Sequence, residues 1–214
     1  MMQNALRQFA RPRGALGHVA GRMMARRNGP LNDWVVELLD IRPRDRVLDV
    51  GYGPGLGVER VAARATQGRV AGIDASEVMC RQALRRNRSA VAAGRVDLRI
   101  GDACKLPFDD ASFSRAMSVN SLKFWISAEE GLREIHRTLE PAGRLVIAHR
   151  MHRADVGRYD RSRYGMTETQ LEELIALLET LGFIEIRVAR SEIRNEHIAA
   201  VQAHCPAATG EDHV

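Results

Sequence analysis

Residues 46–57 read Arg-Val-Leu-Asp-Val-Gly-Tyr-Gly-Pro-Gly-Leu-Gly, an apolar run that ends in glycines at every second position. The run of Val and Leu predicts a buried strand over 46–50. Glycine allows backbone conformations and a close approach to a ligand that other side chains prevent. One carboxylate, Asp49, lies inside this strand, and a second, Asp74, ends another short apolar run. The stretch therefore predicts a strand and a tight turn that together hold a nucleoside-type ligand.

Short apolar runs alternate with helical patterns along most of the chain. The apolar runs predict seven strands, at 46–50, 70–73, 96–100, 113–119, 144–148, 183–188 and 197–203. The helical patterns predict a helix capped by Asn32 or Asp33, a short helix after the glycines, a helix over 76–92, and helices that begin at the capping boxes of Ser127 and Thr167. The short turn before the last strand favours an antiparallel pair. We expect one α/β domain, a Rossmann-like doubly wound sheet that is mostly parallel, with an antiparallel C-terminal hairpin and helices on both faces.

Length and composition are those of a globular domain. The chain has 214 residues, of which 45% are hydrophobic and 28% charged, enough for one domain with a sizeable core. No apolar stretch approaches the roughly 18 residues of a membrane span, and no secretory signal is recognisable, so we expect a cytoplasmic protein. Cys80, Cys104 and Cys205 are isolated and odd in number, which argues against disulfides and a zinc site. We expect no metal.

The positive charge has two interpretations. The net charge of +5 suits a nucleic-acid partner, but Lys105 and Lys123 are the only lysines, and the arginines are spread along the chain among acidic residues. This preference for arginine over lysine is better explained by a GC-rich coding genome than by a nucleic-acid binding patch. We therefore expect no nucleic-acid partner.

The first 32 residues contain arginine and no acidic residue. Within 15–27, apolar residues recur at helical spacing, at Leu16, Val19, Ala20, Met23 and Met24. This segment fits a helix packed on the domain edge, a lid over a ligand site, or an amphipathic targeting or membrane-surface segment.

The spacing of the glycines restricts the ligand. The dinucleotide pattern G-x-G-x-x-G needs a small third residue, and that position holds Leu56 or Val58, which disfavours a nicotinamide-dependent oxidoreductase. No G-K-[ST] follows, so a phosphate loop is excluded as well. The pattern that fits is acid-x-Gly-x-Gly-x-Gly.

With this pattern the chain resembles the class I S-adenosylmethionine-dependent methyltransferases, in particular the small-molecule enzymes of the methyltransferase type 11 pattern. The resemblance runs from Val47 to Ala148 and includes the stretches 72–76, 101–113 and 139–147. It implies S-adenosyl-L-methionine as methyl donor, S-adenosyl-L-homocysteine as product, and a small-molecule acceptor methylated at oxygen, nitrogen or carbon. We also expect an N-terminal helical cap over 1–40, a cofactor-binding methyltransferase domain over 41–205 and a disordered tail over 206–214.

The resemblance further implies where the cofactor binds. Asp74 would accept hydrogen bonds from both ribose hydroxyls, Asp102 would meet the adenine amino group, and Asp49 would lie near the methionine amino end. The full implied set is Asp49, Gly51, Tyr52, Gly53, Gly55, Asp74, Ala75, Met79, Asp102, Ala103 and Asn120. Structural alternatives remain open: Asp49 as a brace of the turn, Asp74 as a helix cap, Asp102 as a turn residue and Met79 as core.

The methyl group on a sulfonium is already activated, so the protein mainly has to align the acceptor and exclude water. A general base is needed only for an acceptor that holds its proton. His149 and His152 follow the fifth strand and are the candidate catalytic residues. The arginines at 150, 153, 158, 161 and 163 either attract an acidic acceptor or form a solvated loop.

The segment 118–125 reads Ser-Val-Asn-Ser-Leu-Lys-Phe-Trp. It lacks the Asn/Asp-Pro-Pro-Tyr/Phe arrangement of enzymes that methylate base amines or glutamine amides, which disfavours a nucleic-acid substrate. Phe124 and Trp125 either line the acceptor pocket or pack against a helix. A different class also remains, a non-catalytic protein that binds S-adenosylmethionine.

Overall fold

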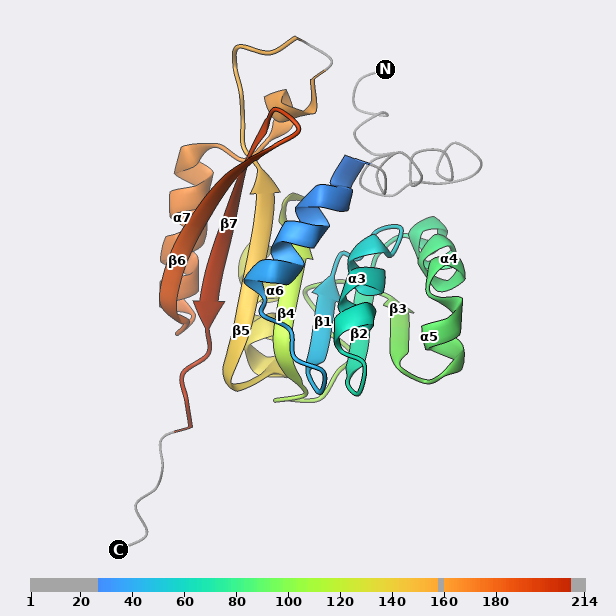
Figure 1. The fold of residues 1–214 in the computed structure, drawn as a ribbon. Helices are drawn as coiled ribbons and strands as arrows, with labels where there is room; N and C mark the ends of the chain where they lie inside the picture. Colours follow the sequence, from blue (N-terminus) through green and yellow to red (C-terminus); the bar gives the residue numbers. More distant parts are fainter. Residues whose placement is uncertain (1–26, 158–159, 209–214) are drawn as a thin grey trace, which may run out of the picture.

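A computed structural model describes residues 27–157 and 160–208. Its centre is a seven-stranded sheet in the order β3-β2-β1-β4-β5-β7-β6 (Figure 1). The strands are β1 Arg46–Val50, β2 Arg69–Asp74, β3 Val96–Ile100, β4 Phe113–Val119, β5 Leu139–Arg150, β6 Ile184–Ile193 and β7 Glu196–His204. The first five strands pair in parallel, and β7 runs antiparallel to β5 and β6. The predicted seven-stranded, mostly parallel sheet is confirmed.

The C-terminal hairpin is joined by two residues, Arg194 and Asn195. Their φ angles are 54° and 61°, in the left-handed region that two-residue hairpin turns require. This turn sets the register that brings Glu196 to the start of β7.

Helices cover both faces of the sheet (Figure 1). They include α3 Leu56–Arg64, α4 Glu77–Arg86, α5 Arg88–Ala92, α6 Ala128–Thr138 and α7 Glu168–Thr180; the turns η1 Leu122–Phe124 and η2 Arg161–Tyr164 are 3-10 helices. A helix over 27–38 packs with α3 and α4 on one face, and α6 and α7 pack on the other. None of the helices in the described ranges is long and apolar enough to cross a membrane.

The strand order reverses between β1 and β4. From β1 the chain proceeds outward through β2 and β3, then returns to place β4 on the other side of β1. The connections that leave β1 and β4 therefore diverge to opposite faces of the sheet and leave a crevice at the carboxyl ends of these two strands. The glycine turn follows β1 into this crevice.

Several predicted boundaries are wrong; among them, the strand predicted over 183–188 continues to Ile193, and the strand predicted over 144–148 already begins at Leu139. The helix predicted over 76–92 is interrupted at Asn87, whose side chain bonds to another segment, and so divides into α4 and α5. Asn32 and Asp33 cap no helix, because helical structure already runs from residue 27 to 38. The fifth strand extends to Arg150 because its pairing with β7 continues from Arg144 through Arg150.

Two expectations fall partly on residues that the structure does not describe. The amphipathic segment of 15–27 lies almost wholly in the undescribed 1–26. Of the expected tail, 206–208 is exposed and has no regular structure, and 209–214 lies outside the described residues.

Candidate functional site

The glycine turn is built on left-handed backbone. The φ angles of Gly51, Gly53 and Gly55 are 82°, 54° and 80°, a region that residues with a side chain rarely adopt. A Cβ on Gly51 would collide with the Ser121 hydroxyl, whereas a Cβ on Gly53 would meet nothing within 4 Å. The Gly51 amide packs the turn against β2 by donating to Ile73 O at 2.8 Å. Gly53 thus presents bare backbone to the crevice.

Asp74 joins this turn to the end of β2. Its Oδ2 accepts a hydrogen bond from Gly53 N at 2.9 Å, and its Oδ1 accepts one from Ser76 N at 2.8 Å. The N-cap of α4 is Ser76, which accepts from Met79 N, so the capping role belongs to the serine. Burial raises the pKa of Asp74, and the hydrogen bonds donated by the backbone amides of Gly53 and Ser76 oppose that rise.

The glycine turn is braced from behind by the end of α4. The Asn87 amide donates from Nδ2 to Gly55 O at 3.0 Å and to Ala83 O at 2.9 Å. Arg86 Nε donates to Pro54 O at 3.1 Å. Asn87 is buried, so these bonds satisfy a polar group that would otherwise be costly. Nothing in the sequence pattern indicates this brace, because the helical periodicity continues through Asn87.

Asp49 lies in a pocket beside the glycine turn. The pocket is lined by Asn28, Asn32, Asp49, Gly51, Tyr52, Gly53, Pro54, Leu56, Gly57 and Val119. Burial raises the pKa of Asp49 to about 8, and the charge of Asp74 adds to the rise. The carboxyl group is therefore largely protonated at neutral pH in the ligand-free protein. A cation placed in the pocket would favour its charged form.

Two polar residues of the pocket lining, Asn28 and Asn32, were not predicted as site residues, and neither were Pro54, Leu56, Gly57 and Val119. Asn32 was expected as a cap, but it lies inside the helix with Asn28 one turn before it, and its Nδ2 donates to Asn28 O at 2.7 Å. Asn28 Oδ1 is buried and has no hydrogen-bond partner within the described part of the chain. The sequence offered one indication that Asn32 belongs to a site, namely its position in the apolar stripe that continues through Val35 and Val36. A polar residue at a buried helix position needs a hydrogen-bond partner.

Tyr52 and the loop after β3 close the far end of the crevice. The Tyr52 ring covers Gly72, and its hydroxyl donates to Arg99 O at 3.1 Å. Asp102 Oδ1 accepts from Cys104 N at 3.0 Å, which closes the loop on itself. Of the other predicted cofactor residues here, Ala75 is exposed, while Met79 and Ala103 are buried.

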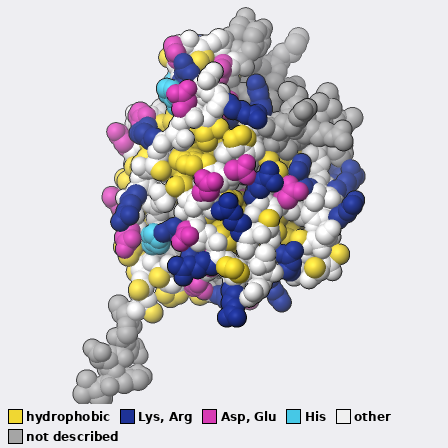
Figure 2. All heavy atoms as spheres, in the orientation of Figure 1, with side chains coloured by type: hydrophobic (Ala, Val, Ile, Leu, Met, Phe, Trp, Pro, Cys, Tyr) yellow, Lys and Arg dark blue, Asp and Glu magenta, His cyan; other side chains and the backbone are white. Residues whose placement is uncertain are grey.

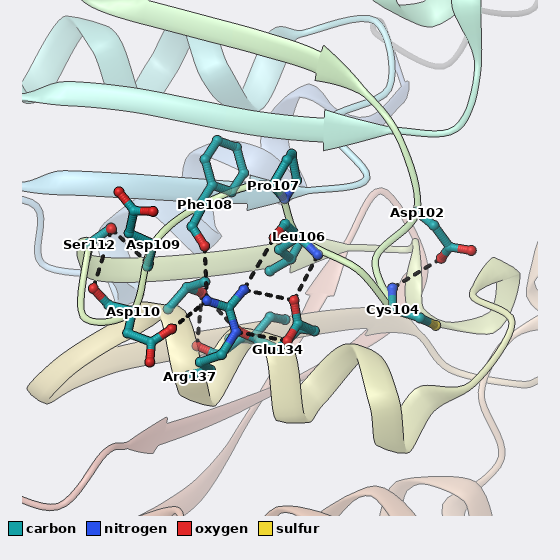
Figure 3. A network of polar contacts seen from close by, with 12 residues as sticks. Asp102, Cys104, Leu106, Pro107, Phe108, Asp109, Asp110, Ser112, Glu134 and Arg137 are labelled. Carbon is teal, nitrogen blue, oxygen red and sulfur yellow. Dashed lines mark hydrogen bonds and ion pairs between the residues drawn. The ribbon is translucent and has the colours of Figure 1, made fainter.

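Arg137 of α6 holds the segment that follows this loop (Figure 3). Its guanidinium donates to the carbonyls of Leu106 and Phe108 and pairs with Asp110 at 2.6 Å and Glu134 at 2.8 Å. Asp102 lies apart from this network. Asp110, which precedes β4, is thus engaged in an ion pair with Arg137. The described residues contain no group of three side chains suited to a metal.

At the carboxyl end of β4, Asn120 has a φ of 55° and connects to β5. Its side-chain Oδ1 accepts a hydrogen bond from Arg150 N at 2.9 Å, and its backbone N–H donates one to Ala148 O at 2.8 Å. Beyond it, the Trp125 indole donates to Ser121 Oγ at 2.9 Å and packs on Gly131 of α6, while Phe124 is 42% exposed. Of the two aromatic residues considered for the acceptor pocket, Trp125 packs against a helix and Phe124 lies at the surface.

The two candidate catalytic histidines lie outside the Asp49 pocket. His149 is buried on the face of α6 and α7, between Ile147 and Met151 of that core, and burial, with the charges of Lys123 and Arg150, lowers its pKa to about 3. His152 is exposed, with Nδ1 2.8 Å from Arg163 O. It lines a separate cavity of about 370 Å³ with residues of α7, β6 and β7.

The comparisons with known proteins agree with this geometry. A family model described as a methyltransferase domain matches residues 48–147. The chain is 30% identical over 189 residues to the uncharacterized methyltransferase YdaC of Bacillus subtilis, a match that covers 88% of this chain and 99% of YdaC. It is also 30% identical over 115 residues to UbiE of Geotalea daltonii, a ubiquinone/menaquinone biosynthesis C-methyltransferase; this match covers 53% of the chain and about half, 49%, of UbiE.

The fold is similar to that of phosphoethanolamine N-methyltransferase 2 of Haemonchus contortus, solved with S-adenosyl-L-methionine. The TM-score is 0.68 at 20% identity, covering 83% of this chain and 52% of that one. The residues present fit the cofactor: Gly53 offers open backbone, and the orphaned Asn28 Oδ1 offers an acceptor to an ammonium group. This chain belongs to the class I S-adenosylmethionine-dependent methyltransferases, with S-adenosyl-L-methionine as its cofactor.

Proposed function

We propose that the protein transfers a methyl group from S-adenosyl-L-methionine to a small-molecule acceptor at oxygen, nitrogen or carbon. The observation that carries the proposal is the crevice in which the glycine turn, Asp49 and Asp74 meet. UbiE and the phosphoethanolamine enzyme, both named for small-molecule acceptors, support that substrate class. They differ in the atom they methylate, so neither identifies the acceptor of this chain.

The proposed contacts follow the crevice from one end to the other. Asp74 accepts hydrogen bonds from the ribose hydroxyls. It uses the carboxylate lone pairs that remain free beside the hydrogen bonds from Gly53 N and Ser76 N. Asp102 and the backbone at Ala103 meet the adenine edge, and Met79 packs near it. At the other end, Asp49 and Asn28 face the ammonium end of the methionine part, together with Gly51.

The bound cofactor supplies an activated methyl group on a cationic sulfur. The protein's own part is to fix the acceptor in line with that methyl group and to exclude water. His149 stays neutral because its pKa is lowered to about 3, and so low a pKa makes it a weak base. His152 offers Nε2 as a hydrogen-bond acceptor, because the carbonyl of Arg163 requires the proton on Nδ1. We propose that alignment supplies most of the acceleration, with His152 the better placed of the two histidines to accept a proton.

We propose no nucleic-acid partner. On the face drawn in Figure 2, basic and acidic side chains are intermixed. Among the described residues, several arginines are paired: Arg60 lies 2.8 Å from Asp33 and Arg86 3.3 Å from Glu59. A nucleic-acid interface requires a contiguous basic surface.

The three cysteines form no disulfide, which supports a cytoplasmic location.

The test is calorimetric titration with S-adenosyl-L-methionine and S-adenosyl-L-homocysteine, followed by a metabolite screen for incorporation of a labelled methyl group. We expect micromolar binding that Asp74→Ala lowers by at least tenfold. Asp97→Ala is the matched control, because Asp97 is an exposed carboxylate on β3 that pairs with Arg99 at the surface. Absence of binding at high micromolar concentration would refute the proposal. Binding without transfer to any acceptor would instead indicate a non-catalytic cofactor-binding protein.

A further inference from the structure

Unsatisfied buried polar atoms gather at the carboxyl ends of β4 and β5. Of the seven buried side-chain atoms without a hydrogen-bond partner among the described residues, four lie here: Ser118 Oγ, Asn120 Nδ2, His149 Nε2 and Arg150 Nε. Buried polar groups are paired in the great majority of cases, so such a concentration marks a place where a ligand or ordered water completes the structure. It lies next to the cofactor pocket but outside its lining.

The four atoms divide between the two faces of the sheet. Side chains alternate along a strand, so His149 lies with Ile147 over α6 and α7, and Arg150 lies with Ala148 on the opposite face. Ala148 is aligned with Val119 of β4, which lines the cofactor pocket. Arg150 therefore lies on the strand next to Val119, two residues beyond Ala148 toward the carboxyl edge of the sheet. It is on the same face of the sheet as the cofactor pocket.

Arg150 is a buried cation whose hydrogen-bonding capacity is only partly used. Its side chain is 5% exposed, and its Nη2 lies 2.7 Å from Glu196 Oε2. The Nε donor is buried and has no partner within 27–157 or 160–208. A guanidinium offers five donors in a planar fork, and a desolvated guanidinium with an unfilled donor strongly favours an anionic oxygen.

Asn120 presents a donor beside the backbone of Arg150. Because Asn120 Oδ1 accepts the Arg150 amide at 2.9 Å, the orientation of the carboxamide is fixed by that bond, and its free end is Nδ2. Nδ2 is buried without a partner among the described residues. In the adjacent strand, the buried Ile198 is aligned with Arg150.

We propose that Arg150 and Asn120 bind an anionic oxygen of the methyl acceptor, so that the acceptor carries a carboxylate, phenolate or enolate group. The inference rests on the proposed function. An acceptor bound as its anion has released its proton to solvent before binding, so the pocket needs no base. This explains how methyl transfer proceeds although neither histidine lines the cofactor pocket.

The test uses 1-naphthoate as an anionic probe and 1-naphthamide as its neutral counterpart, both titrated calorimetrically into the protein saturated with S-adenosyl-L-homocysteine. We expect naphthoate to bind at least tenfold more tightly than naphthamide. Arg150→Gln should abolish this preference and leave the affinity for S-adenosyl-L-homocysteine within twofold. Arg153→Gln is the matched control, because Arg153 pairs with Asp155 on the surface and should retain the preference.

Arg150→Gln leaves Glu196 without its partner, so a second variant keeps the test decisive if the first is unstable. Glu196→Gln removes the carboxylate that competes for the guanidinium, and we expect naphthoate affinity to rise severalfold. A purely structural ion pair would give no such gain. Equal binding of the two probes to the wild-type protein, or a preference that survives Arg150→Gln, overturns the inference. An equal loss of S-adenosyl-L-homocysteine affinity in that variant also overturns it, because Arg150 would then serve the cofactor. Failure of S-adenosyl-L-homocysteine to bind the wild-type protein refutes the proposed function instead.

Discussion

The side chain of Asn87 donates a hydrogen bond to the main-chain carbonyl of Gly55, 32 residues away along the chain, at 3.0 Å. The break between two helices thus holds the cofactor loop in place. Replacement by alanine removes this bond and leaves the Gly55 carbonyl with only the bond from Glu59 N of α3, at 3.1 Å.

Asn87→Ala is therefore expected to lower the free energy of unfolding by about 1–3 kcal/mol, because it removes two buried hydrogen bonds, to Gly55 O and Ala83 O, each of which contributes about 0.5–1.5 kcal/mol. It should also weaken binding of S-adenosyl-L-homocysteine, because the loop is no longer fixed. Urea unfolding and calorimetry measure the two effects. Gln67→Ala is the control, since Gln67 is exposed and its side chain bonds to Arg44 at the surface. Equal stability of the two variants would contradict the role of Asn87 as a brace.

Alanine at two neighbouring glycines should have opposite consequences. At Gly51 the new methyl group collides with Ser121, so Gly51→Ala should be strongly destabilised. At Gly53 the methyl group meets open space, and the left-handed φ costs only about 1–2 kcal/mol. Gly53→Ala should fold and bind S-adenosyl-L-homocysteine at least tenfold more weakly, because its methyl group projects into the crevice. Thermal unfolding and calorimetry test this; a Gly51→Ala protein as stable as Gly53→Ala would disprove it.

Cofactor binding should release a proton. The pKa of Asp49 is about 8 in the ligand-free protein, and a bound cation favours the carboxylate. Between about pH 6 and about pH 7.5 the affinity for S-adenosyl-L-methionine should rise with pH, by at most about tenfold per unit. Titrations near neutral pH in buffers of different ionisation enthalpy should show close to one proton released. Asp49→Asn should release none, and identical heats for both proteins would rule out Asp49 as the source.

The same group makes stability depend on pH. The pKa of Asp49 is raised from 3.8 to about 8 on folding, so the folded state binds more protons than the unfolded state between these values. The free energy of unfolding should therefore fall as pH rises from about 4 to about 8. An asparagine side chain cannot ionise, so Asp49→Asn should match the wild type near pH 4 and exceed its stability above about pH 8 by at least about 1 kcal/mol. Urea unfolding across this range measures the difference, and parallel pH profiles would contradict it.

The strands and the crevice were predictable because their signals are local. A buried parallel strand is a short apolar run, and a left-handed turn needs glycine, so the sequence around Asp49 and Gly51 specifies both the strand and the turn. The mostly parallel character of the sheet follows from the alternation of strands and helices, and the C-terminal hairpin from the short connection before the last strand. These elements required no knowledge of distant contacts.

The residues that were missed depend on contacts between distant segments. Asn28 and Asn32 have the side chain that favours helix caps, and only the packing of their helix over β1 and β4 turns them toward the pocket. Arg150 was named among the arginines considered for an acidic acceptor, but its pairing with Glu196 was not predicted, because it depends on the insertion of β7 beside β5, which no spacing in the sequence encodes. Asn87 lies within an unbroken helical pattern, so its bond to the loop was not visible either.

Because two backbone amides donate hydrogen bonds to Asp74, the contact proposed between Asp74 and the ribose is hard to isolate by mutation. Since the same carboxylate anchors Gly53 and Ser76, any substitution at Asp74 disturbs the shape of the loop together with the ligand contact. The ligand is the better variable. A 2′-deoxy analogue of S-adenosyl-L-homocysteine removes one hydroxyl and leaves the protein untouched, so its loss of affinity measures that single hydrogen bond against an already formed loop.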